Sequence, residues 1–208
     1  MVLKMLNSIE LRWFFKGAIP EDFVKFCNLS FKCKIEHRID YYLELKNCNY
    51  LGIKLRDKRL EIKWRKNSND IIRLLNQNIS GNIESWVRWE WTDESSYNDI
   101  IKFMNINDYS PFIKIYKKRF QKKFIVRNTT LEEIHFDQRI FDCAVEVTEL
   151  KINDQLWWSI GFDIFKGKNK SLFEIMIKDY FVQDLSLNLN VENSYGYPEW
   201  LSKNFTSA

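Results

Sequence analysis

Closely spaced basic residues in the stretch LGIKLRDKRLEIKWR, residues 51–65, could grip an anion. Apolar and charged side chains alternate there on both sides of a short turn, and on a β-strand such alternation puts all the charged ones on one face. These residues are Lys54, Arg56, Glu61, Lys63 and Arg65. Arginine holds phosphate through two parallel N–H donors, and lysine holds it as a point charge. The pattern therefore predicts a hairpin that binds phosphate or another compact anion.

The same alternation places further charged residues on one face of other stretches. The basic ones are Arg12, Arg88, Lys117 and Arg119, and the acidic ones are Glu10, Glu90, Glu146 and Asp163. Basic residues outnumber acidic ones in the whole set, so a multiply charged anion such as a polyphosphate would balance it. Carboxylates beside bound phosphates are also the ligands that Mg²⁺ and Mn²⁺ prefer.

Eight stretches with strand-like alternation must position these residues. They span residues 7–15, 34–45, 50–56, 59–66, 84–92, 112–126, 141–152 and 156–165. Short links between most of them favour an antiparallel sheet, and eight strands are enough to close into a barrel. Helical patterns occur at residues 20–30, 68–80, 95–105 and 169–189. The predicted fold class is α+β, mainly β: an eight-stranded antiparallel closed barrel, or tunnel, with flanking helices.

Two arrangements of the charged faces agree with this pattern. If the apolar faces fill the barrel, the charges face water; if helices cover the apolar faces from outside, the charges lie within. The apolar faces are rich in tryptophan, with Trp13, Trp89, Trp91 and Trp158 among them, and need such a cover. We therefore expect a charged interior, which is costly unless the charges pair or hold a ligand.

Composition limits the classes of protein that remain. The chain of 208 residues, 45% hydrophobic, can bury a sizeable core, and we expect one domain over residues 1–208, with a C-terminal helix and clasp at about 170–208. A net charge of +4 is too small for a general polycation, so anion binding must come from local arrangement. No long apolar run or signal-peptide pattern occurs, which predicts a cytoplasmic protein without membrane contact. The four cysteines and two histidines lack metal-site spacing.

In strand order and charge placement, residues 8–165 resemble the CYTH group, the triphosphate tunnel metalloenzymes. That family folds as an eight-stranded tunnel whose first strand carries a Glu-x-Glu-x-Lys motif, and it includes thiamine triphosphatases, inorganic triphosphatases and a class of adenylate cyclases. The resemblance implies triphosphate binding by Lys54, Arg56, Lys63, Arg88, Lys117 and Arg119, to which the alternation adds Arg12 and Arg65. It implies Mg²⁺ or Mn²⁺ binding, or water positioning, by Glu10, Glu90, Glu146 and Asp163.

The first-strand motif differs from that of the family. This chain reads Ser8-Ile9-Glu10-Leu11-Arg12, with a hydroxyl in place of the first carboxylate and arginine in place of lysine. A hydroxyl binds Mg²⁺ more weakly than a carboxylate. Two functions stay open: a metal-dependent triphosphatase with Glu10 and Glu90 as catalytic residues, or a tunnel that binds a phosphorylated small-molecule anion without turnover.

A third interpretation is a module that binds single-stranded nucleic acid. The stretch KIYKKRFQKKFIVR, residues 114–127, mixes basic residues with Tyr116, Phe120 and Phe124, whose rings could stack on bases. The pattern favours the alternative, one long strand whose outer face carries solvated lysines.

Overall fold

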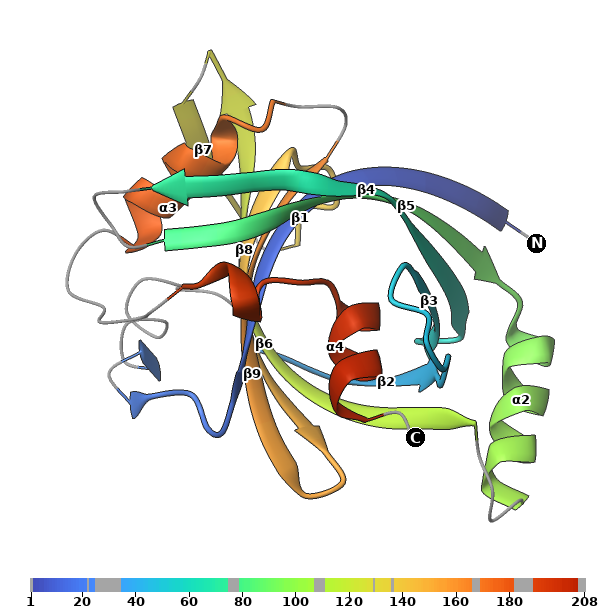
Figure 1. Ribbon diagram of the computed structural model, residues 1–208. Helices are drawn as coiled ribbons and strands as arrows, with labels where there is room; N and C mark the ends of the chain where they lie inside the picture. The colour runs from blue at the N-terminus through green and yellow to red at the C-terminus, as the bar shows by residue number, and fades with distance from the viewer. Residues whose placement is uncertain are drawn as a thin grey trace.

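The computed structural model shows eight antiparallel strands closed into a ring, which confirms the predicted barrel (Figure 1). It describes residues 2–21, 23–24, 35–74, 79–106, 111–128, 130–135, 137–165, 169–181 and 189–205. The strands of the ring are β1 (Val2–Lys16), β2 (Glu36–Leu43), β3 (Leu51–Arg56), β4 (Arg59–Leu74), β5 (Ile79–Thr92), β6 (Phe112–Arg127), β8 (Cys143–Ile152) and β9 (Gln155–Phe165). They pair in the order β2-β3-β4-β5-β1-β9-β8-β6, and β6 pairs back onto β2. The short strand β7 (Thr130–Ile134), which the sequence did not predict, pairs with β6 outside the ring.

The β3–β4 hairpin confirms the hairpin predicted within residues 51–65. Residues 57–58 at its turn have φ angles of 46° and 62°. Two successive left-handed residues form the tight turn whose twist matches the paired strands. The register then sets Lys54 opposite Glu61 and Arg56 opposite Arg59, so the hairpin pairs unlike charges at one level and like charges at the next.

Each strand of the ring presents charged side chains to the interior. Along β1, Glu10 and Arg12 line the inner cavity, whereas Leu11 and Trp13 are buried on the outside. This alternation follows from the pleat of a strand, in which successive side chains point to opposite faces. The predicted charged interior is therefore present.

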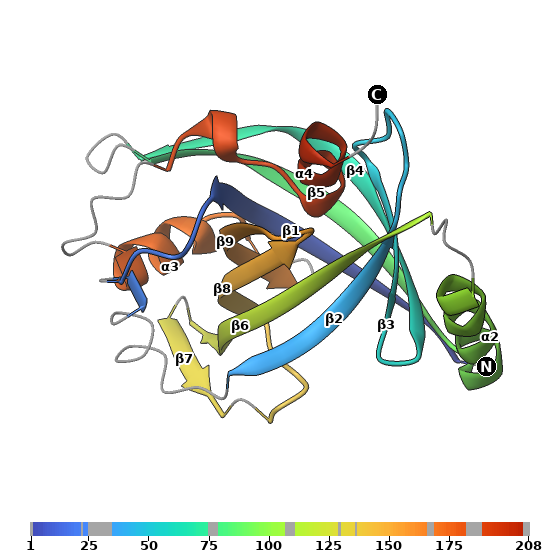
Figure 2. The ribbon, with the colours of Figure 1, turned by 90° about the horizontal axis from the view of Figure 1, so that it is seen from below.

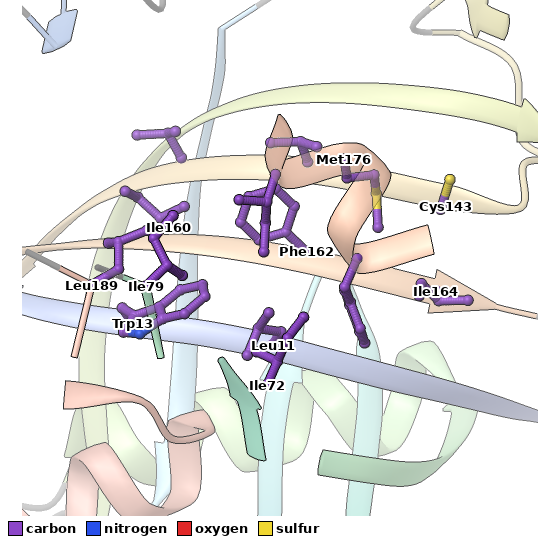
Figure 3. Close-up of a cluster of buried hydrophobic side chains, with 14 of the residues drawn as sticks. Leu11, Trp13, Ile72, Ile79, Cys143, Ile160, Phe162, Ile164, Met176 and Leu189 are labelled. Atoms are coloured by element: carbon purple, nitrogen blue, oxygen red, sulfur yellow. The ribbon is translucent and has the colours of Figure 1, made fainter. Parts of the chain in front are cut away.

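The apolar outer faces pack under the helix α3 (Leu172–Phe181) on one side of the ring. Figure 3 shows Met176 of this helix near Phe162 of β9, with Leu11 and Trp13 of β1 in the same cluster. Phe162 and Trp13 pack edge to face, with ring centroids 6.2 Å apart. Because this apolar core lies outside the barrel, the interior is left for polar groups.

The C-terminal segment closes one end of the ring. After the short 3₁₀ helix η2 (Val191–Asn193), the helix α4 (Tyr197–Asn204) lies within the ring in Figure 1 and at one end of it in Figure 2. Pro198 occupies the first turn of α4, where no backbone donor is needed. Trp200 is fully buried and stacks on Phe14 of β1, with centroids 4.7 Å apart. The predicted C-terminal clasp is thus the helix α4, which fills the end of the barrel beside Phe14; we call this helix the plug.

Helix predictions had mixed outcomes. The helix α2 (Glu94–Ile106) confirms the prediction at 95–105, and Asp93 begins it by accepting a hydrogen bond from the backbone N–H of Ser95 at 3.2 Å. Of the helix predicted at 20–30, only residues 20, 21, 23 and 24 are described. None of the described helices has the length and hydropathy needed to span a lipid bilayer.

The helix predicted at residues 68–80 is wrong. Residues 68–74 continue β4, and residues 79–80 begin β5, while 75–78 lie outside the described residues. Ile72 is buried and pairs with Gly81, whereas Ile71 is exposed, which is the alternation of a strand. A short apolar run fits either period, and here the pairing with β5 decides it.

Candidate functional site

The interior of the barrel contains a cavity of about 1050 Å³. It brings together nearly all the residues that were predicted to form the site. Eleven of them line it: Glu10, Arg12, Lys54, Arg56, Lys63, Arg88, Glu90, Lys117, Arg119, Glu146 and Asp163. The exception is Arg65. The volume is in the range of small-molecule binding sites.

Positive charge dominates the lining of this cavity. Among the described residues, twelve lining side chains are basic: Lys4, Arg12, Arg38, Lys54, Arg56, Arg59, Lys63, Arg88, Lys117, Arg119, Lys123 and Arg139. Five are acidic: Glu10, Glu61, Glu90, Glu146 and Asp163. Asp40, Glu36 and Asp57 lie outside the lining but pair with lining cations, and they raise the acidic count to eight. Twelve minus eight leaves a surplus of four basic side chains.

The most deeply buried part of the lining surrounds Asp40 of β2. This group, the Asp40 cluster, comprises Arg38, Asp40, Lys54, Arg56, Glu61 and Lys117. Arg56 donates Nε to Asp40 Oδ1 at 2.7 Å and Nη2 to Oδ2 at 2.9 Å, and Lys117 Nζ lies 3.0 Å from Oδ2. Lys54 Nζ lies 3.1 Å from Glu61 Oε2. Four cations thus share two carboxylates.

This crowding changes the protonation of the two lysines. Burial, together with the neighbouring Arg56 guanidinium, lowers the pKa of Lys54 to about 7 and that of Lys117 to about 7. Although burial opposes it, the Lys117 ammonium and the other cations hold the pKa of Asp40 well below its usual range. An anion placed beside the lysines would favour their charged forms. The Asp40 cluster is therefore short of negative charge.

A second group, the Arg12 cluster, joins β1 to β6, β8 and β9. It comprises Arg12, Arg119, Glu146, Thr148, Ser159 and Asp163. Arg12 Nη1 donates to Glu146 Oε1 at 2.9 Å and to Ser159 Oγ at 3.2 Å, while Nη2 lies 3.7 Å from Asp163 Oδ2. Arg119 Nη1 donates to the other oxygen of Glu146, Oε2, at 2.9 Å. Glu146 is thus held between two guanidinium groups.

Asp163 is the least compensated carboxylate of the Arg12 cluster. Its Oδ1 atom is buried and accepts no hydrogen bond from the described residues. Burial, and the charge of Glu10, its cross-strand neighbour on β1, raise the pKa of Asp163 to about 7.

The remaining predicted residues form two pairs. Glu10 accepts a hydrogen bond from Ser8 Oγ at 2.6 Å and forms a salt bridge with Lys63. The Lys63 ammonium also lies over the ring of Trp86, 4.8 Å from its centroid. On β5, Arg88 Nη2 lies 3.0 Å from Glu90 Oε1.

Arg65 does not line the cavity, so its predicted role in anion binding stays a prediction. Its Nη1 lies 2.5 Å from Glu84 Oε1 and 3.0 Å from Glu199 Oε2 of α4. The alternation does bring it to the inner face, but at the end that α4 closes. Arg65 therefore holds the plug in place.

Three of the four predicted metal ligands pair with cations of the chain. Among the described residues, no three histidine, cysteine, aspartate or glutamate side chains are arranged to hold a metal ion. Glu146 faces Arg12 and Arg119, Glu10 faces Lys63, and Glu90 faces Arg88. These three carboxylates are already paired with cations of the chain, whereas Asp163 keeps one oxygen, Oδ1, without a hydrogen bond from the described residues. With three of the four predicted ligands paired in this way, the donor set fits Mg²⁺ or Mn²⁺ poorly.

Sequence reasoning missed several lining residues. Arg38 and Asp40 lie on β2, where polar residues occur on both faces and alternation gives no signal. Arg59 follows the same alternation as Glu61 and could have been included. Tyr197 comes from α4, far along the chain, and its ring covers Lys117, with Nζ 3.7 Å from the centroid.

Two of the three rings that nucleic-acid binding would use on β6 are buried. Phe120 and Phe124 are buried in the outer core, with 2% and 0% exposure, so they cannot stack on bases. Tyr116 is exposed, but Lys117 and Arg119 beside it point into the cavity.

No model of a known protein family matches the chain, and a search of curated proteins found no match.

Proposed function

We propose that the barrel binds a small polyanion containing a triphosphate, inside the cavity. The observation that carries this proposal is the surplus of four basic side chains around a cavity of about 1050 Å³. Lys4 and Arg139 are exposed, whereas the other lining cations are buried or half-buried. Buried charge without a partner is costly, so the surplus favours a ligand that supplies negative charge.

The amount and distribution of the surplus support a triphosphate over a single phosphate. A triphosphate carries roughly four negative charges, given one to two on a terminal phosphate and one on each of the others. The cations are spread from the Asp40 cluster to Lys63 and Arg88, which suits an extended chain of phosphates better than one compact group. The charged tunnel implied by the resemblance to the triphosphate tunnel metalloenzymes supports the same ligand class.

The proposed function is binding alone, without hydrolysis of the ligand. Glu10 and Glu90, the predicted catalytic residues, are paired with Lys63 and Arg88. Neither is free to act as a general base until its cation moves to the ligand.

The first experiment is a thermal melt and calorimetric titration with inorganic tripolyphosphate, using sulfate at matched ionic strength as the control anion. Ligand at about 100 times its dissociation constant stabilises the fold by about 2.7 kcal/mol. For a chain of this length that is a rise of roughly 5 to 11 °C. A rise no larger than that with sulfate contradicts the proposal.

Two neighbouring lysines of β6 provide a matched pair of variants. Lys117→Met removes a cation that lines the cavity, whereas Lys118→Met removes one that does not. We expect Lys117→Met to weaken tripolyphosphate binding and Lys118→Met to leave it unchanged. Equal losses in both variants would indicate binding to the general surface charge.

A further inference from the structure

The guanidinium of Arg12 lies where the carboxylates of β1, β8 and β9 come closest. It is 6% exposed and contacts Glu146 and Asp163, and Glu10 is the next acidic neighbour on its own strand. We propose that Arg12 takes the place of a divalent cation among these carboxylates, so that the cavity binds its polyanion without a metal. The inference rests on the proposed function for the identity of the ligand, but not for the state of the carboxylates.

Gly161 of β9 leaves a slot that fits the guanidinium. Arg12 and Gly161 are cross-strand partners. A Cβ atom on Gly161 would lie 2.4 Å from Arg12 Cζ and 2.8 Å from Nη1, far inside contact distance. The absence of a side chain at this position is what lets the guanidinium lie flat against β9 beside Ser159.

The hydrogen bonds of Glu146 show that its oxygens are already in use. Oε1 accepts from Arg12 at 2.9 Å and from Thr148 Oγ1 at 3.0 Å, and Oε2 accepts from Arg119 at 2.9 Å. Three donors therefore occupy most of the acceptor sites of Glu146, and a metal ion would have to share these oxygens with two guanidinium groups or displace one of them.

Glu10 is committed in the same way. One oxygen accepts from Ser8 at 2.6 Å, and the other forms the salt bridge with Lys63. Ser8 therefore supports the carboxylate instead of adding a second one. Glu146 and Glu10 are thus held by hydrogen bonds and cations from the chain itself, while Asp163 keeps its Oδ1 atom without a hydrogen-bond donor among the described residues.

A built-in guanidinium differs from a metal in what it gives the ligand. It carries one positive charge and directional N–H donors, and it cannot be removed by a chelator. Arg12 lines the cavity while it is paired, so it compensates the carboxylates that would otherwise repel a polyanion.

The test separates metal uptake from polyanion binding. Mn²⁺ is titrated into the protein alone and followed by electron paramagnetic resonance, and tripolyphosphate is titrated separately in buffer with EDTA and in metal-free buffer. We expect no stoichiometric Mn²⁺ uptake by the wild type, and equal tripolyphosphate affinity in both buffers. Uptake of one Mn²⁺ per chain at micromolar concentration, or loss of tripolyphosphate binding in EDTA, overturns the inference.

Two variants sharpen this result. Arg12→Ala uncovers the carboxylates and should tighten Mn²⁺ binding by about tenfold or more, the scale of a change in a metal's surroundings. Arg12→Lys keeps a cation and should not. Equal Mn²⁺ affinity in both variants argues against the proposal, and if Arg12→Ala does not fold, the wild-type titrations decide. Absence of tripolyphosphate binding in every buffer refutes the proposed function, while the Mn²⁺ titration still decides the role of Arg12.

Discussion

The contact between Gly161 and Arg12 makes a quantitative prediction about stability. In Gly161→Ala, the new methyl group would lie 2.4 Å from both Cζ and Nη2 of Arg12, so the guanidinium must shift away from β9. A shift that breaks its buried pair with Glu146 costs about 3 to 5 kcal/mol. Glu146 keeps its second pair, with Arg119, which places the expected loss at the lower end, about 3 kcal/mol.

The loss is measured by urea unfolding, with thermal melts alongside. About 3 kcal/mol corresponds to a fall of roughly 6 to 12 °C in melting temperature for a chain of this length. Gly52→Ala is the matched control: Gly52 also lines the cavity, but a Cβ there meets Pro198 Cγ at 3.1 Å and Cδ at 3.9 Å, a milder contact than the one at Gly161. We expect that variant to lose less than about 1 kcal/mol.

A double-mutant cycle identifies the cause. If the clash with Arg12 is responsible, Gly161→Ala should be much better tolerated once Arg12→Ala has removed the guanidinium. The coupling should be about 1 to 3 kcal/mol, as for residues in direct contact. Additive effects of the two substitutions would refute the assignment of the slot to Arg12.

Three further predictions concern Lys117, the plug and Arg65. Because the folded pKa near 7 of Lys117 is below its unfolded value, the unfolded chain binds more protons between these values. The free energy of unfolding without ligand should therefore rise above pH 7, by up to about 1.4 kcal/mol per pH unit for each lysine that is neutral in the folded state. The rise should be less steep in Lys117→Met. A free energy of unfolding that does not change with pH, measured by urea unfolding, would contradict this prediction. In the same assay, Trp200→Ala should lower the free energy of unfolding by about 3 to 5 kcal/mol, because Trp200 is fully buried. Trp64→Ala should lower it little, because Trp64 is 45% exposed. Equal losses in the two variants would contradict the role of α4 as a plug. In tripolyphosphate titrations, Arg65→Met should retain wild-type affinity and Arg88→Met should lose affinity; the reverse order would return Arg65 to the site.

Much of the cavity was predictable because one local rule governs it. Period-two alternation assigns each residue of a strand to a face, and on β1 or β9 the heavy apolar side leaves no doubt about which face is charged. On β2 the rule fails, because His37 and Tyr41 make the outer face polar as well. The cations from β3 and β6 meet at Asp40 because β2 lies between those two strands. The β2–β6 pair that closes the ring joins residues far apart in the chain, so a local pattern does not reveal it.

Where the structure differs from the sequence prediction, the difference comes from contacts between residues far apart in the chain, which a local pattern does not show. Arg65 has the right parity, but the partner that removes it from the site is Glu199, 134 residues away. Residues 68–74 carry an apolar run that suits a helix, and only their pairing with β5 makes them a strand. The ion pairs inside the barrel likewise form only once the ring is closed. The pairing of Arg12 with Glu146 and Asp163 could therefore not be predicted from spacing.

Because α4 fills one end of the barrel, the described residues leave the cavity open toward the other end, near Met5 and Ile140, which are 61% and 72% exposed. From Lys4 to Arg12 the inner face of β1 runs about 26 Å, at roughly 3.3 Å per residue. If the cavity binds a phosphate chain as proposed, a long chain would enter by its terminus, so binding would depend on chain length.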